Sequence, residues 1–159
     1  MEKETIYLDA SVPSAYYDER VAWRREYTTE WWKEELPKYD VFISEVVIAE
    51  IMETEQSKRK DELLELVKEF SELKLSSEIE EIAKGHVNQG IIPPYQLPDA
   101  LHVAIASFYK IDFLVTWNCK HLAEAHRRKS VRLFNTSAGL FVPDILTPLE
   151  ITKGGEENV

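Results

Sequence analysis

The sequence predicts an α/β fold with one parallel sheet that is covered by helices on both faces. Short apolar runs of β-prone residues at 6–8, 41–43 and 113–116 alternate with longer segments of helical periodicity. The chain has no internal repeat and no low-complexity linker between these segments. Its 159 residues are enough for a single core. We therefore expect one domain over residues 1–151 and a disordered acidic tail at 152–159.

Composition excludes several classes of protein. The chain carries 29 acidic against 19 basic residues, a net charge of −10, so it lacks the excess of basic charge typical of many nucleic-acid-binding proteins. A site in which divalent cations supply the positive charge is compatible with this composition. Cys119 is the single cysteine, which excludes an intrachain disulfide and fits a reducing compartment. With neither a long apolar run nor a signal-peptide pattern, the protein is expected to be cytoplasmic and without a membrane segment.

The first predicted strand, Ile6-Tyr7-Leu8, ends on a carboxylate. Its continuous apolar character is typical of a strand that is buried on both faces of a parallel sheet. In open α/β sheets, ligand sites lie beyond the carboxyl ends of the strands, where Asp9 would stand. Ser11 is a good N-cap and Pro13 suits a first turn, so a helix should follow.

An aromatic stripe marks the next helix, which is predicted over residues 19–36. Trp23, Tyr27 and Trp31 recur at every fourth position, and Trp32 lies beside them. Such stripes usually face inward, so core packing is the favoured interpretation. The alternative is an interaction surface for a dimer mate or an inhibitor, and exposure of the tryptophans decides between the two.

The second strand, 41–43, leads into a helix over residues 45–56 that Ser44 is suited to cap. Glu50 is embedded in a nearly continuous apolar segment of this helix. An unpaired buried carboxylate is costly. Glu50 should therefore have a cation, a metal ion or a hydrogen-bond donor nearby, unless it lies on the wet side of the helix.

The middle of the chain predicts two more helices and a short strand. Residues 58–70 are predicted to form an amphipathic helix, 73–75 are a strand candidate, and Ser77 is expected to cap a helix that runs to about residue 89. His86 lies near the end of that helix, where it is expected to interact with the helix dipole.

A proline-containing loop at 90–98 delivers Asp99 into the first turn of a helix that extends to Tyr109. Because this helix is apolar on almost every side, it should pack tightly against the sheet. Asp99 is either a partner of the helix dipole or a metal ligand. His102, one turn further on, is expected to be a hydrogen-bonded core residue.

The last third of the chain contains the third strong strand, at 113–116. Asn118 follows it and is predicted to cap a short helix over 120–123. A further helix is predicted over 128–138 and a last strand over 144–146. Right-handed crossovers then place the carboxyl ends of all the parallel strands on one edge of the sheet.

Four oxygen ligands should meet at this carboxyl edge. Asp9 and Asn118 follow strands, whereas Glu50 and Asp99 lie in helices that can project toward the same edge. Mg²⁺ and Mn²⁺ prefer oxygen ligands, and converging carboxylates repel one another unless a cation lies between them. A metal ion held there can polarise a phosphoryl oxygen and activate water for attack.

Other catalytic motifs are absent from the sequence. It contains no glycine-rich phosphate loop and no serine elbow with flanking glycines. His121 and His126 are five residues apart, so they do not share a helical face as zinc ligands would. Cys119 and His121 are a weak candidate for a nucleophile and its base.

Four segments together resemble PIN-domain proteins of the VapC toxin class, and the resemblance covers residues 5–151. They are Tyr7-Leu8-Asp9-Ala10-Ser11, Ile43-Ser44-Glu45-Val46-Val47-Ile48-Ala49-Glu50-Ile51, Pro98-Asp99-Ala100-Leu101-His102-Val103-Ala104-Ile105-Ala106 and Ile111-Asp112-Phe113-Leu114-Val115-Thr116-Trp117-Asn118-Cys119-Lys120-His121-Leu122. The resemblance implies a three-layer α/β/α sandwich with a central parallel sheet. It also implies a Mg²⁺- or Mn²⁺-dependent endoribonuclease, the toxin of a type II toxin–antitoxin pair, which an antitoxin protein neutralises and which is often a homodimer.

By the same resemblance, Asp9, Glu50 and Asp99 match the first three acidic residues of the family's catalytic metal site. Asp9 and Asp99 would hold the ion, and Glu50 would contribute to the site by orienting or deprotonating the attacking water. The fourth catalytic position is commonly Asp, and here it is Asn118. Asn118 can position a water or a second ion but adds no negative charge.

Thr116 and Ser11 are expected to hydrogen-bond around these ligands. Candidates for contacts with RNA phosphates are Arg24, Arg25, Lys120, Arg127, Arg128 and Lys129. Two alternatives to a ribonuclease toxin stay open. One is a weakened or non-catalytic PIN-like domain that acts through protein or RNA binding, which Asn118 motivates. The other is a metal-dependent nuclease that cleaves DNA or processes RNA.

Overall fold

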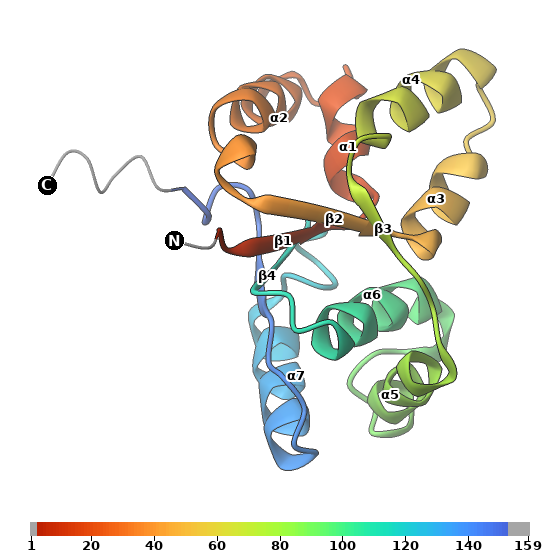
Figure 1. Cartoon of the computed structure of the whole chain (residues 1–159), viewed down its shortest axis with the longest axis vertical. Coiled ribbons are helices and arrows are strands. Elements are labelled where there is room, and N and C mark those ends of the chain that lie inside the picture. The colour runs from red at the N-terminus through yellow and green to blue at the C-terminus, as the bar shows by residue number, and fades with distance from the viewer. Residues whose placement is uncertain (1–2, 153–159) are drawn as a thin grey trace, which may run out of the picture.

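A five-stranded parallel sheet forms the centre of the computed structural model, which describes residues 3–152 (Figure 1). The strands are β1 (Thr5–Leu8), β2 (Asp40–Ser44), β3 (Ser71–Leu73), β4 (Phe113–Val115) and β5 (Asp144–Leu146). They lie in the order β3-β2-β1-β4-β5, and every neighbouring pair is parallel. The central strand is therefore β1, the first strand of the sequence.

Helices cover both faces of this sheet. They are α1 (Ser11–Tyr17), α2 (Ala22–Glu34), α3 (Glu45–Met52), α4 (Ser57–Val67), α5 (Ser77–Asn88), α6 (Leu97–Phe108) and α7 (Ala125–Ser137), with short 3-10 helices η1 (Leu36–Lys38) and η2 (Pro94–Gln96). Figure 1 shows α1, α2 and α4 on one side of the sheet and α5, α6 and α7 on the other. The predicted three-layer α/β/α sandwich is thus confirmed.

The apolar run of β1 is buried as predicted. Ile6, Tyr7 and Leu8 have no exposed surface, and Tyr7 lies in register with Phe42 of β2 and Leu114 of β4. Because both neighbours run parallel to β1, the carboxyl ends of the three strands meet at one edge of the sheet. The segments that follow these strands therefore start close together.

Two local predictions in the middle of the chain were wrong by a few residues. Ser76, rather than Ser77, caps α5, because Ser76 Oγ accepts a hydrogen bond from Ile79 N at 3.3 Å. The strand predicted at 73–75 lies at Ser71–Leu73, where it pairs with the last residues of β2. This strand is at the edge of the sheet and mostly exposed, so it lacks the apolar run that marks the buried strands.

The segment after β4 also differs from its prediction. Residues 120–123 form a turn and not a short helix. The backbone oxygen of Asn118 accepts hydrogen bonds from both His121 N (3.3 Å) and Ala123 N (3.0 Å), which closes the turn. The helix predicted over 128–138 begins earlier, as α7 at Ala125, because the Glu124 carboxylate accepts hydrogen bonds from the backbone N–H groups of His126 and Arg127.

The aromatic stripe of α2 mainly serves the core. Trp31 is buried and its indole N–H donates to the backbone oxygen of Ile151 at 3.0 Å. Tyr27 and Trp32 are partly buried and pack against the core. Trp23 is the exception, with 57% of its surface exposed and its ring edge-on to the buried Trp117.

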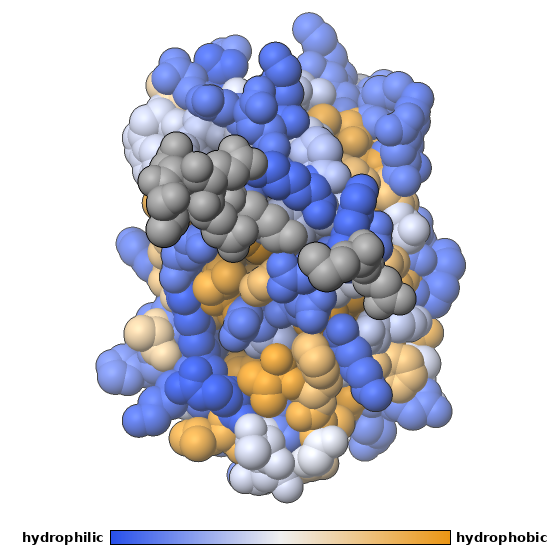
Figure 2. Space-filling view, turned by 60° about the vertical axis from the view of Figure 1, so that its left-hand side comes forward, coloured by the Kyte–Doolittle hydropathy of each residue, from blue (hydrophilic) through white to orange (hydrophobic). Residues whose placement is uncertain are grey.

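The surface reflects the acidic composition. Figure 2 shows mainly hydrophilic residues on the face that it presents, with apolar residues in patches between them. Within residues 3–152, none of the helices has the length and apolar character needed to span a bilayer. Of the expected tail at 152–159, only Thr152 belongs to the described part of the chain.

Candidate active site at the carboxyl edge of the sheet

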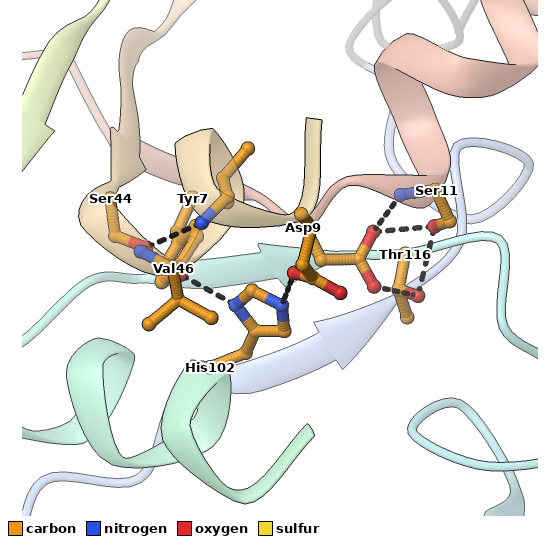
Figure 3. A network of polar contacts seen from close by, with 9 residues as sticks. Tyr7, Asp9, Ser11, Ser44, Val46, His102 and Thr116 are labelled. Atoms are coloured by element: carbon orange, nitrogen blue, oxygen red, sulfur yellow. Dashed lines mark hydrogen bonds and ion pairs between the residues drawn. The ribbon is translucent and has the colours of Figure 1, made fainter. Parts of the chain in front are cut away.

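Asp9 directly follows the central strand and is held by hydroxyl groups on both sides. Its side chain is almost buried, since only 4% of the residue surface is exposed. Asp9 Oδ2 accepts a hydrogen bond from Thr116 Oγ1 at 2.6 Å, and Asp9 Oδ1 accepts from Ser11 N at 3.0 Å and from the Ser11 hydroxyl (Figure 3). These contacts fix the position of the carboxylate at the end of β1.

The same two hydroxyls join the loops after β1 and β4. Ser11 Oγ accepts a hydrogen bond from Trp117 N at 2.9 Å, and Thr116 Oγ1 accepts from Asn118 N at 2.9 Å. The expected capping role of Ser11 was wrong, because α1 is preceded by Ala10 and has no side-chain cap. Ser11 instead begins α1 and donates its hydroxyl hydrogen to Asp9.

Glu50 projects from the last turn of α3 and is hydrogen-bonded to a histidine. Its side chain is 32% exposed, and Glu50 Oε1 accepts from His102 Nε2 at 2.7 Å. His102 is buried on α6, and its Nδ1 lies 2.6 Å from the Tyr7 hydroxyl. His102 is thus a hydrogen-bonded core residue, as predicted, but one of its two partners is a carboxylate of the candidate site.

Asp99 and Asn118 meet at a second histidine. Asp99 lies in the first turn of α6 with a 16% exposed side chain, and its Oδ2 is 3.8 Å from His121 Nδ1. Asn118 Nδ2 is 3.2 Å from the same nitrogen. From the sequence, His121 was considered and rejected as a zinc ligand with His126, and was considered as a partner of Cys119, which is exposed. The sequence signal that could have placed His121 at the site is its spacing of three residues from Asn118, which a turn brings close together.

Burial and mutual repulsion act on the carboxylates of this edge. Burial raises the pKa of Asp9 and of Asp99, and the charge of Glu50 raises both further, while the charge of His102 opposes the effect. Burial works against a charged His102, yet the hydrogen bond and charge of Glu50, with the charges of Asp9 and Asp99, raise the pKa of His102 overall. The site therefore concentrates negative charge that a cation can offset.

A family model described as PIN domain matches residues 6–125 of the chain. This protein belongs to the PIN domain family. The matched region contains all four oxygen ligands that the sequence indicated. No curated protein matches the sequence.

Two solved toxin structures share the PIN fold. VapC20 of Mycobacterium tuberculosis, described as a sarcin-ricin loop cleaving toxin, has a TM-score of 0.60 at 16% identity, over 76% of this chain and 95% of that chain. VapBC2 of Rickettsia felis, solved bound to a DNA fragment from their promoter, has a TM-score of 0.54 at 13% identity, over 90% of this chain and 98% of that chain. At such identities the likeness establishes the fold.

The chemistry of the donor groups in this PIN domain fits a divalent cation. Asp9, Glu50 and Asp99 supply the hard oxygen ligands that Mg²⁺ and Mn²⁺ prefer, and burial, with a smaller contribution from the charge of Glu50, raises the pKa of Asp9 and Asp99. Among residues 3–152, no three His, Cys, Asp or Glu side chains form a group that could hold a metal ion as they stand. The inference of a bound cation therefore rests on the chemistry of these carboxylate oxygens and not on a preformed ligand cage.

Several of the basic residues expected to contact RNA have protein partners. Arg24 lies 3.4 Å from Asp18, and Arg128 makes two hydrogen bonds of 2.9 Å to Glu150. Arg127 Nη1 donates to Gln96 Oε1 at 2.7 Å. Arg127 also lies near enough to Asp99 for its charge to lower the pKa of that carboxyl group. Of these three arginines, Arg127 is therefore the one whose charge acts on the candidate site.

Proposed function

We propose that this PIN domain is a divalent-metal-dependent endoribonuclease and the toxin of a toxin–antitoxin pair. The observation that carries the proposal is the arrangement of Asp9, Glu50 and Asp99. Asp9 directly follows β1, Glu50 lies in α3 and Asp99 in α6, and the charge of Glu50 acts on both aspartates at one edge of the sheet. Nucleases of this kind require such an acidic, cation-dependent edge.

Each acidic residue has a role in this proposal. Asp9 and Asp99 would hold Mg²⁺ or Mn²⁺, together with Glu50. The bound cation supplies Lewis-acid activation of the phosphoryl group and of the attacking water. Glu50, whose side chain is more exposed (32%) than those of Asp99 (16%) and of the almost buried Asp9, orients that water and accepts its proton.

Asn118 is the position at which this site departs from the usual family pattern. Its amide lies against His121 and adds no negative charge. We expect it to position a water molecule and to lower cation affinity relative to a fourth carboxylate. This departure is the specific observation that favours the second candidate function, a weakened or non-catalytic PIN domain that acts through protein or RNA binding.

The proposed partners follow from the toxin function. RNA is the proposed substrate, by analogy with VapC20, which is described as a sarcin-ricin loop cleaving toxin. An antitoxin protein is the proposed inhibitor, by analogy with the VapBC2 complex. We also propose a homodimer that acts in the cytoplasm.

An RNA cleavage assay tests the proposal. Purified wild-type protein should cut single-stranded RNA in Mg²⁺ or Mn²⁺ and lose the activity in EDTA, and Asp9→Asn should be inactive in both ions. Asp40→Asn is the matched control, because Asp40 is exposed at the opposite end of β2 and should leave cleavage unchanged. If wild-type protein cuts no RNA with either ion, and its expression slows growth no more than Asp9→Asn does, the non-catalytic function is the correct one.

A further inference from the structure

A single line of hydrogen bonds, which we call the Ser44–Glu50 relay, crosses the interior behind the acidic edge. Ser44 Oγ lies 2.6 Å from the Tyr7 hydroxyl, which lies 2.6 Å from His102 Nδ1. His102 Nε2 lies 2.7 Å from Glu50 Oε1. Ser44, Tyr7 and His102, which Figure 3 labels, are fully or almost fully buried, so water does not compete for the two bonds among them, whereas Glu50 is partly exposed.

The N-cap of α3 fixes the direction of the relay. Ser44 Oγ accepts hydrogen bonds from Val46 N and Val47 N, at 3.2 and 3.3 Å, which occupy its lone pairs. The Ser44 hydrogen is therefore available for the Tyr7 oxygen, and the Tyr7 hydrogen for His102 Nδ1. A neutral His102 then carries its own hydrogen on Nε2, which points at Glu50.

This donation to Glu50 does not depend on the charge of His102. In the neutral form the relay places the hydrogen on Nε2, and in the charged form both ring nitrogens carry one. Glu50 Oε1 thus receives a hydrogen bond from a buried, fixed donor in either form. A glutamate side chain has several rotatable bonds, and such a donor restricts it to one orientation.

The relay also connects the elements that carry all three carboxylates. Tyr7 lies on β1, two residues before Asp9, which directly follows that strand. Ser44 caps the helix that bears Glu50. His102 lies three residues after Asp99 on α6, on the same helical face. Each acidic residue therefore has a member of the relay on its own segment of the chain, which is Tyr7 for Asp9, Ser44 for Glu50 and His102 for Asp99.

We propose that His102 is a positioning residue that holds the Glu50 carboxylate toward the cation and substrate, with its donor nitrogen fixed by Tyr7 and Ser44. This inference rests on the proposed function, since Glu50 acts there on the attacking water. A donor that orients a metal-site carboxylate typically changes cation affinity or activity by about 10–100-fold when it is lost.

Two substitutions of similar size separate positioning from mere filling of the core. The amide of a His102→Gln variant reaches the place of Nε2, so it can still donate to Glu50. The shorter amide of His102→Asn reaches the place of Nδ1, so it can contact Tyr7 but not Glu50. His86→Asn is the matched control, because His86 is a second fully buried histidine whose partner is Asn135 and not a carboxylate.

The first readout is Mn²⁺ binding by calorimetry and RNA cleavage by the purified variants. We expect His102→Asn to weaken Mn²⁺ binding and to lower kcat by about 10–100-fold with a smaller change in KM. His102→Gln should stay within a few-fold of wild type, and His86→Asn should bind Mn²⁺ like wild type even where its Tm falls. Equal losses in His102→Asn and His102→Gln, or no loss in His102→Asn, would overturn the positioning role.

The second readout needs neither metal nor activity. The ¹⁵N spectrum of the imidazole side chains, recorded in EDTA at a pH where His102 is neutral, should show the hydrogen of His102 on Nε2. Glu50→Gln should shift the Nε2 resonance, and Tyr7→Phe should shift Nδ1. A hydrogen on Nδ1, or an Nε2 resonance that ignores Glu50→Gln, overturns the inference even if wild-type protein cleaves RNA. If the protein shows the expected spectrum but neither binds Mn²⁺ nor cleaves RNA, the relay is supported and the proposed nuclease function is wrong.

Discussion

Thr116 donates its hydroxyl hydrogen to Asp9 across 2.6 Å, although 107 residues separate the two in the sequence. The same oxygen accepts from Asn118 N, so one hydroxyl links the end of the central strand to the loop after β4. Thr116 is fully buried, and water cannot replace either bond. This threonine therefore contributes both to the stability of the fold and to the position of the first carboxylate.

Replacement of Thr116 by valine keeps the shape of the side chain and removes the hydroxyl. Asp9 Oδ2 and Asn118 N then lose their partner, and we expect the free energy of unfolding to fall by about 1–3 kcal/mol in urea denaturation. Thr116→Ser keeps the hydroxyl and should lose less. Equal stability of Thr116→Val and wild type would show that the two bonds contribute little.

Asp9→Asn should separate stability from function. Because burial and the charge of Glu50 disfavour a charged Asp9, the variant should have a Tm in EDTA that is at least as high as that of wild type. Addition of Mn²⁺ should raise the Tm of wild type and of Asp40→Asn, but not that of Asp9→Asn, because a ligand stabilises only the form that binds it. A fluorescence melting series over metal concentration measures this, and equal Mn²⁺ shifts in all three proteins would exclude Asp9 as a ligand.

Substitutions of Asn118 test the fourth position. Asn118→Asp should keep or raise Mn²⁺ affinity, because it adds a carboxylate beside Asp99. Asn118→Ala should lower cleavage less than Asp99→Ala does. Calorimetry and RNA cleavage measure the two effects, and if Asn118→Ala is silent in both, the residue only closes the turn after β4.

His86 makes stability depend on pH. Burial lowers the pKa of His86 below its usual 6.5, even though a hydrogen bond with Asn135 favours the charged form. The folded protein therefore binds fewer protons at this site than the unfolded chain, and the free energy of unfolding should fall as pH drops below 6.5 toward the folded-state pKa. Urea denaturation at a series of pH values should show a shallower fall for His86→Gln. Parallel curves for the two proteins would contradict the assignment.

The sequence was informative where burial is complete. A strand covered on both faces must be apolar throughout, so Ile6, Tyr7 and Leu8 could be recognised without a structure. The N-cap at Ser44 was also predictable, for a different reason, because capping depends on the local sequence and backbone geometry. The edge strand at Ser71–Leu73 lacks this signal, since it is exposed, and its prediction was displaced by two residues.

The candidate site was only partly accessible from the sequence. Acidic residues at strand and helix ends indicated Asp9, Glu50 and Asp99, but not which neighbours hold them. The pairing of Glu50 with His102 spans 52 residues, and no local pattern encodes it. His121 was missed as a site neighbour because the segment was predicted to be helical, whereas a turn brings the imidazole toward Asp99 and Asn118.

The order β3-β2-β1-β4-β5 places the candidate site at the point where the chain changes its direction across the sheet. From β1 the chain proceeds through β2 to β3, and it then returns to the opposite side of β1 for β4 and β5. The helices that follow β1 and β4 consequently lie on opposite faces of the sheet, and the loops that lead into them diverge from the same edge (Figure 1). Residues 117–124 lie outside the strands and carry Asn118 and His121, so the surroundings of the candidate site can change in this segment while the pairing of the sheet is left unchanged.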